Sequence, residues 1–216
     1  MLRSTEDDPD APGIAVNLLA SALFLVGVAM LYGVTGTLAM ADMAQKLAAI
    51  PAADRGLLHA GLAILAVAFL AKAAMWPLGF WLVPAYSAAS APAAAMFAIM
   101  TKVGVYAVVR VWTLFFPVDG ASSAFGADAL VAGGLVTLAF GSLGIMATQR
   151  LGRLAGYSVI VSSGTLLAAA SFGVPALTGG ALYYLASSTL AVAALYLLVE
   201  LVERARSVEV APTDEE

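Results

Sequence analysis

Two lysines, Lys72 and Lys102, lie near the middle of long apolar stretches of this 216-residue chain. Residues 57–84 read LLHAGLAILAVAFLAKAAMWPLGFWLVP, and residues 91–116 read APAAAMFAIMTKVGVYAVVRVWTLFF. An ammonium at the centre of a bilayer costs roughly 2.5–3.5 kcal/mol on insertion scales. Because apolar surroundings favour the neutral form of a lysine, such a group can release and rebind a proton near neutral pH. The two lysines are therefore candidate proton-relay sites.

Three further polar residues are weaker candidates for the same chemistry. Lys102, Tyr106 and Arg110 recur every four residues, so they share one face of a helix and form a polar stripe. The stripe is expected to face protein or water, although Arg110 could instead be a residue that snorkels from a helix end. His59 precedes Lys72 by 13 residues, about 20 Å along a helix, and is either a relay residue or an interfacial one.

A proline in the first of these stretches predicts an interruption close to Lys72. Pro77 has no backbone N–H and would free the carbonyl of Ala73, so we expect a kinked or broken helix there. Broken helices at membrane depth occur where they are buried in protein or line water. The alternative is a kink that serves packing alone, since proline is common in membrane helices.

The composition places the chain among integral membrane proteins. It is 62% hydrophobic and 11% charged, whereas soluble domains have about 25% charged residues. A span needs about 20 apolar residues, which predicts an all-α bundle with about six spans: 13–34, 57–84, 91–116, 127–147, 154–174 and 178–202. Small residues would let these helices approach closely: Ser21, Ala88, Ala91, Gly134, Gly141 and Gly164.

The ends of the chain are polar. We expect an acidic tail over 1–12, a transmembrane bundle over 13–203 and a polar tail over 204–216. With six spans, the tails and the even-numbered turns share one side, which holds Arg3, Arg150, Arg153, Arg204 and Arg206. The opposite side holds Lys46 and Arg55. The positive-inside rule therefore predicts that both termini are cytoplasmic.

Several classes of function find no support in the sequence. There is no cysteine and only one histidine, so we predict no disulfide, no metal site and no bound cofactor. No basic run indicates nucleic-acid binding, and no nucleophile–base pair or carboxylate pair indicates an enzyme. The last two predicted spans instead carry hydroxyl groups that could bond between helices, bond to their own backbone or hold water: Tyr157, Ser158, Ser162, Ser163, Thr165, Tyr183, Tyr184, Ser187, Ser188 and Thr189.

The sequence of residues 71–111 is more distinctive than a membrane span requires. The run AKAAMWPLGFWLVPAYSAASAPAAAMFAIMTKVGVYAVVRV resembles the core of the proton-conducting antiporter-like membrane subunits, closest to the D subunit of Mrp-type multisubunit Na⁺/H⁺ antiporters. The residues on the pattern are Lys72, Pro77, Trp81, Leu82, Pro84, Tyr86, Pro92 and Lys102. LYGVTGTLAMADMA at 31–44 and RLAGYS at 153–158 support the match, which covers about 14–203.

The resemblance implies a partial copy of a larger fold. Family members are bundles of about 14 helices built on inverted repeats, and this chain would correspond to the sixth to eleventh. Lys72 matches the lysine of the broken seventh helix, and Lys102 matches that of the eighth. The family's fifth-helix glutamate, which pairs with the first lysine, has no counterpart here. Ser187 stands where relatives often carry a histidine, and the resemblance therefore makes it a further candidate relay residue.

The function implied is that of a membrane subunit, partial in length, of a multisubunit monovalent cation/proton antiporter. It would be a multi-pass protein of a bacterial-type cell membrane that works with other subunits, the lipid bilayer, protons and Na⁺. Two alternatives stay open: a proton-pumping subunit of a complex I-like NADH-quinone oxidoreductase or hydrogenase, and a non-conducting structural or assembly subunit. Because the glutamate is missing, we expect that the chain alone does not complete transmembrane proton transfer.

Overall fold

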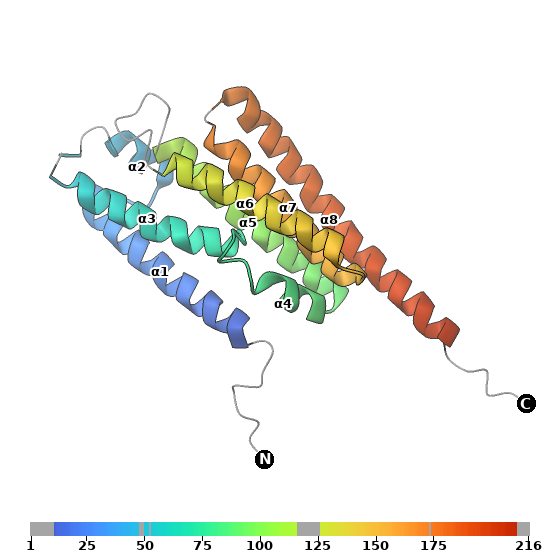
Figure 1. Cartoon of the computed structure of the whole chain (residues 1–216). Helices are drawn as coiled ribbons and strands as arrows, with labels where there is room; N and C mark the ends of the chain where they lie inside the picture. The colour runs from blue at the N-terminus through green and yellow to red at the C-terminus, as the bar shows by residue number, and fades with distance from the viewer. Residues whose placement is uncertain (1–10, 48–49, 52, 116–125, 173, 211–216) are drawn as a thin grey trace, which may run out of the picture.

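The computed structural model describes residues 11–47, 50–51, 53–115, 126–172 and 174–210. In these residues the regular structure is helical throughout (Figure 1). The helices are α1 (Ala11–Thr35), α2 (Met40–Lys46), α3 (Arg55–Lys72), α4 (Leu82–Ala88), α5 (Ala91–Phe115), α6 (Ala127–Ala147), α7 (Leu151–Ser171) and α8 (Pro175–Val210).

Six of the described helices are long and apolar enough to cross a membrane, which confirms the predicted number of spans. They are α1, α3, α5, α6, α7 and α8, and they run alternately up and down the bundle (Figure 1). As a result, α1 begins and α8 ends at the same end of the bundle. The two short helices, α2 and α4, lie at its opposite ends.

The second predicted span differs most from the structure. Residues 57–84 do not form one kinked helix, because α3 ends at Lys72 and α4 begins only at Leu82. The break predicted near Pro77 is therefore present, as a nine-residue interruption that contains this proline. A sum of hydropathy along the chain does not reveal such a gap, because the intervening residues AAMWPLGFW carry no charged side chain.

The last helix is longer than its predicted span, 178–202. α8 continues to Val210, past the residue at which the polar tail was expected to begin. Glu200 and Arg204 form an i,i+4 ion pair on its surface, and such pairs support a helix outside the apolar core. The outermost parts of the two predicted tails, 1–10 and 211–216, lie outside the described residues.

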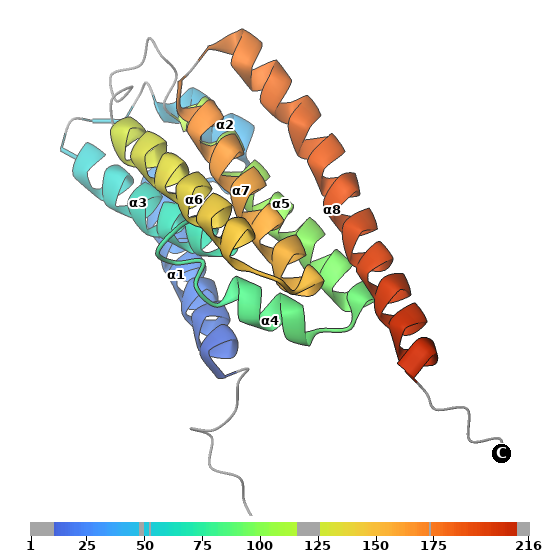
Figure 2. The same ribbon diagram turned by 45° about the vertical axis from the view of Figure 1, so that its right-hand side comes forward.

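Helices α6 and α7 pack with their backbones in contact, and both views show them side by side (Figure 2). A Cβ atom at Gly164 would lie 2.5 Å from the amide nitrogen of Leu138, and one at Gly134 would lie 2.6 Å from that of Ala168. At Gly141 a Cβ would lie 2.9 Å from the amide nitrogen of Val161. The predicted close approach at these three glycines is confirmed, and it makes α6 and α7 one unit.

Helix α5 lies at the centre of the bundle. It contributes buried residues to three apolar clusters, with Ala98 packed among α4, α7 and α8, Val111 against α1 and α3, and Val105 against α7 and α8. A polar side chain on α5 is therefore surrounded by protein over much of the helix, which sets the environment of Lys102.

Replacing Gly164 by alanine is expected to lower stability by about 1–3 kcal/mol, because the added methyl group meets backbone rather than a movable side chain. Thermal unfolding in detergent measures the effect as a lower Tm. Gly152 on the same helix is the control, since a Cβ there meets nothing within 4 Å. Gly152→Ala, at the second residue of α7, should not lower the Tm, and equal effects at the two positions would contradict the packing described.

Candidate functional site

Helix α3 ends at Lys72, and the backbone turns left-handed two residues later. Ala74 has φ 57°. The N–H of Met75 donates to the carbonyl of Leu70 at 3.0 Å, and that of Ala74 donates to the carbonyl of Ala71 at 3.4 Å. Glycine usually occupies this position at a helix end, so an alanine gives no sequence signal. The helix thus ends five residues before Pro77, and the proline lies inside the interruption rather than at its start.

Lys72 is half-buried and has a neutral partner on another helix. Its Nζ donates a hydrogen bond to Oδ1 of Asn17 on α1. It is also the last residue of α3, where the unpaired carbonyls give the helix its negative end and favour a cation. An amide oxygen and a helix C-terminus can therefore hold the ammonium without a carboxylate.

A cavity of about 660 Å³ lies beside Lys72, between α1, α3, α4 and α5. Its walls are mostly apolar, and the lining residues with polar side-chain atoms are Lys72, Asn17, Trp81, Tyr86 and Thr101. Tyr86 donates to the carbonyl of Phe97 at 2.7 Å, and its hydroxyl lies 2.5 Å from that of Thr101. The cavity is hereafter called the Lys72 cavity.

Lys102 lies on the other side of α5, away from the Lys72 cavity. Only 2% of its surface is exposed, and its Nζ donates to Oγ of Ser162 on α7. The Ser162 hydroxyl in turn donates to the carbonyl of Val159 at 3.1 Å, so its lone pairs are available to Lys102. A neutral hydroxyl is thus the partner of the most deeply buried cationic side chain among the described residues.

Gly104 is the residue of α5 on which the end of α3 packs, close to both lysines. A Cβ at this position would lie 3.0 Å from the carbonyl carbon of Lys72 and 3.0 Å from the amide nitrogen of Ala73. The end of α3 therefore packs backbone to backbone against α5, two residues from Lys102. This contact brings the two predicted relay lysines to opposite sides of one helix at a common depth.

The structure does not gather the weaker candidates around the two lysines. On α5, Tyr106 is 46% exposed and Arg110 is also exposed, so the predicted stripe leaves the buried face after Lys102. His59 is half-buried near the start of α3 and does not line the Lys72 cavity. Ser187 is exposed on α8 and donates to the carbonyl of Tyr184 in its own helix at 3.2 Å.

Sequence reasoning missed Asn17 and gave no special place to Ser162. Asn17 is the only asparagine of the chain and lies in a predicted span, which is the signal that could have identified it. Ser162 was one of ten hydroxyl residues, and several others bond to their own helix, including Ser158 and Thr165. Only the packing of α7 on α5 distinguishes it from them.

These features define a class: a multi-pass helical membrane protein in which an interrupted helix and a continuous neighbour each hold a lysine with a neutral partner. Residues 13–212 match the family described as NADH:quinone oxidoreductase/Mrp antiporter, transmembrane. The chain belongs to this family, which confirms the resemblance identified in the sequence.

Named relatives include antiporter subunits. The chain is similar to the probable K(+)/H(+) antiporter D subunit of Rhizobium meliloti (strain 1021), with 59% identity over 194 residues, which are 89% of this chain and 36% of the relative. It is 37% identical to the Na(+)/H(+) antiporter D subunit of Bacillus subtilis (strain 168) over 186 residues, which are 86% of this chain and 37% of the relative. The chain thus spans little more than a third of their length.

Two solved assemblies contain chains of similar structure. One is the Mrp complex from Dietzia sp. DQ12-45-1b, with a TM-score of 0.76, 28% identity and coverage of 88% of this chain and 34% of that one. The other is the membrane-bound sulfane sulfur reductase, an archaeal respiratory membrane complex, with a TM-score of 0.78, 27% identity and coverage of 89% and 40%.

Asn17→Ala is expected to lower stability by about 0.5–1.5 kcal/mol, because Lys72 loses its hydrogen-bond acceptor. Asn17→Asp keeps an oxygen acceptor for Lys72, so its Tm in detergent should lie above that of Asn17→Ala. Ser21→Ala is the control, since that hydroxyl donates to the backbone carbonyl of Asn17 within α1. Equal Tm values for the alanine and aspartate variants would contradict the assigned contact.

Proposed function

We propose that the chain is a transporter subunit, or part of one, in a multisubunit monovalent cation/proton antiporter, and that Lys72 and Lys102 relay protons in it. The observation that carries the proposal is the pair of lysines on two sides of α5, each held by a neutral oxygen inside an apolar bundle. The 59% identity to an antiporter D subunit supports the choice of reaction.

Neutral partners suit a group that must change its charge. An amide or hydroxyl oxygen accepts a hydrogen bond from an ammonium or from a neutral amine, whereas a paired carboxylate would favour the ammonium alone. Lys72 can therefore take a proton from water in its cavity, become an ammonium, and give the proton up again. The volume of about 660 Å³ leaves room for water, since each molecule occupies about 30 Å³ in the liquid.

The relay requires proton transfer from the Lys72 side of α5 to its Lys102 side, and Gly104 is the point where the end of α3 meets α5. At this point α5 has no side chain, and the end of α3 packs directly on it. Lys102, as a neutral amine bonded to one hydroxyl, is the next group that can accept a proton. The weaker candidates Tyr106 and Arg110 lie on the exposed part of α5 and would act at the outer end of the route.

The cation and the assembly belong to the same proposal. The chain would work with other subunits in the lipid bilayer of a bacterial-type cell membrane, with both termini cytoplasmic. The names of its relatives include both K⁺ and Na⁺, so either ion fits. The fold likeness to an archaeal respiratory complex supports a second candidate, a proton-translocating subunit of a redox-driven assembly.

Lys72→Ala and Lys102→Ala are each expected to abolish cation-dependent proton exchange when the chain is expressed with the other subunits of its complex. Everted vesicles with a pH-sensitive dye measure this exchange. Lys72→Arg should also fail, because arginine keeps the charge but cannot readily release the proton. The purified chain alone, in proteoliposomes, should show no Lys72-dependent flux.

The control is Lys46→Ala, which removes an exposed lysine that pairs with Asp42 at 3.0 Å on α2. It should leave exchange unchanged. Normal exchange with alanine at either buried lysine, at an unchanged amount of assembled complex, would favour the alternative of a non-conducting structural subunit. Exchange that requires an electron donor instead of a cation gradient would favour the respiratory alternative.

A further inference from the structure

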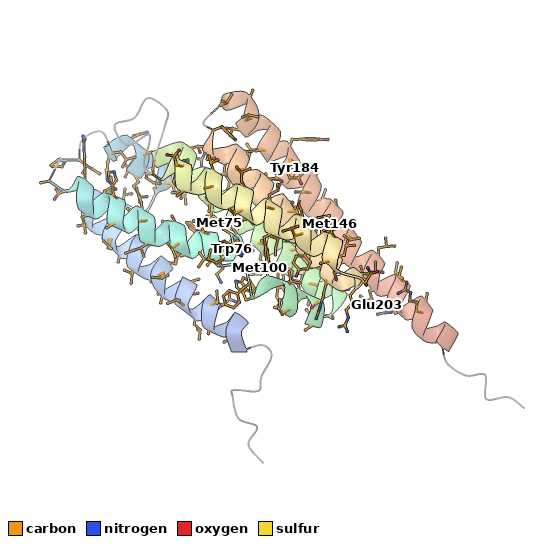
Figure 3. The ribbon with its side chains drawn as sticks, viewed as in Figure 1. Met75, Trp76, Met100, Met146, Tyr184 and Glu203 are labelled. Atoms are coloured by element: carbon orange, nitrogen blue, oxygen red, sulfur yellow. The ribbon has the colours of Figure 1, made fainter. Side chains whose placement is uncertain are left out.

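The α6–α7 pair carries neither lysine, yet it contacts both lysine-bearing segments. On α6, the hydroxyl of Thr137 accepts a hydrogen bond of 2.9 Å from the backbone N–H of Trp76, inside the interruption between α3 and α4. Thr137 is 0% exposed. Figure 3 shows Met75 and Trp76 at the end of α3, where it meets α6.

The Trp76 amide needs this partner. A break in a helix frees backbone groups, and an unsatisfied N–H is costly in an apolar medium. The proton of the Thr137 hydroxyl is donated to the carbonyl of Gly133 at 2.6 Å, so the oxygen lone pairs are free to accept from Trp76. Met75 packs one turn away, with its sulfur 2.8 Å from where a Cβ of Gly133 would lie.

Helix α7 provides the matching contact to Lys102. Ser162 is 4% exposed and accepts the hydrogen bond from Lys102 Nζ. Its own proton is engaged by the carbonyl of Val159. The two hydroxyls thus bond in the same way. Each donates to a carbonyl of its own helix. Thr137 accepts from the backbone that follows Lys72, and Ser162 accepts from Lys102 itself.

The two hydroxyls sit on helices that cannot shift independently. Thr137 lies between Gly134 and Gly141, the two glycines through which α6 touches the backbone of α7. Ser162 lies two residues before Gly164, the third glycine of the contact. A displacement of α6 along α7 would drive backbone atoms together, so the spacing of the two hydroxyls is fixed.

We propose that Thr137 and Ser162 are positioning residues, and that the α6–α7 pair holds Lys72 and Lys102 at a fixed separation through them. The significance of that separation rests on the proposed relay function. The way in which α6 and α7 hold the interruption and the lysines does not depend on that function.

The geometric claim can be tested by thiol labelling, since the chain contains no cysteine. Lys72→Cys places one reporter in the Lys72 cavity of the full chain in membranes, and a small methanethiosulfonate reagent measures its accessibility. Adding Thr137→Val removes the acceptor while keeping the shape, and we expect labelling about tenfold faster, given the cost of an unpaired buried amide. Adding Thr137→Ser keeps the hydroxyl and should leave the rate unchanged.

Two controls separate positioning from general loosening. Thr165→Val on α7 removes a hydroxyl that bonds to its own helix at 3.0 Å and should not alter the labelling. A reporter at Met100→Cys, on the α5 wall of the same cavity, should not respond to Thr137→Val. An unchanged rate at position 72, or equal acceleration at 72 and 100, overturns the proposal. If Thr137→Val does not accumulate, Thr137→Ala takes its place.

The role of Ser162 is tested by rescue. Ser162→Ala should lower exchange about tenfold at an unchanged amount of complex, as expected for a lost hydrogen bond to a charged group, and Ser162→Thr should restore it. The matched control is Ser158→Ala, one turn earlier, whose hydroxyl donates to the carbonyl of Leu154 at 2.9 Å. Unchanged exchange in Ser162→Ala overturns the positioning role of Ser162. If Lys102→Ala also exchanges normally, the relay function fails while the labelling result stands by itself.

Discussion

The constraint on which the site depends is the need to satisfy backbone groups where a helix is interrupted inside an apolar bundle. Between Lys72 and Leu82 the chain has no helical ladder, and water or lipid cannot serve as a general substitute at that depth. The structure meets the need from three directions. The carbonyls of α3 take the first amides in a left-handed turn, α5 packs against the turn at Gly104, and α6 supplies an oxygen to Trp76.

The same constraint explains why the lysines have neutral partners. The interrupted backbone is held against α5 at Gly104 and against α6 at Thr137, and a second buried charge beside it would have to be desolvated as well. An amide on α1 and a hydroxyl on α7 satisfy Nζ without that cost. They also leave the charge of each lysine free to vary, which a fixed ion pair would oppose.

Much of the fold could be predicted from the sequence, because hydropathy and periodicity are local properties. The six spans, the break near Pro77, the close approach at Gly134, Gly141 and Gly164, and the family all followed from residue types and motifs. The partners of the lysines did not, since Asn17 and Lys72 are 55 positions apart and Lys102 and Ser162 are 60 apart. The end of α3 at Lys72 was hidden because Ala74, where the backbone turns left-handed, is an alanine, the strongest helix former.

The contact between Thr137 and Trp76 has a consequence for how such a chain can vary. Its donor is a main-chain amide, which every residue except proline carries. The side chain at position 76 can therefore drift without losing the bond, whereas position 137 must retain a hydroxyl of the right reach. The sequence constraint is thus shifted away from the interruption itself and onto α6, a helix that carries neither lysine. A search for functional positions that follows ionisable residues alone would pass over it.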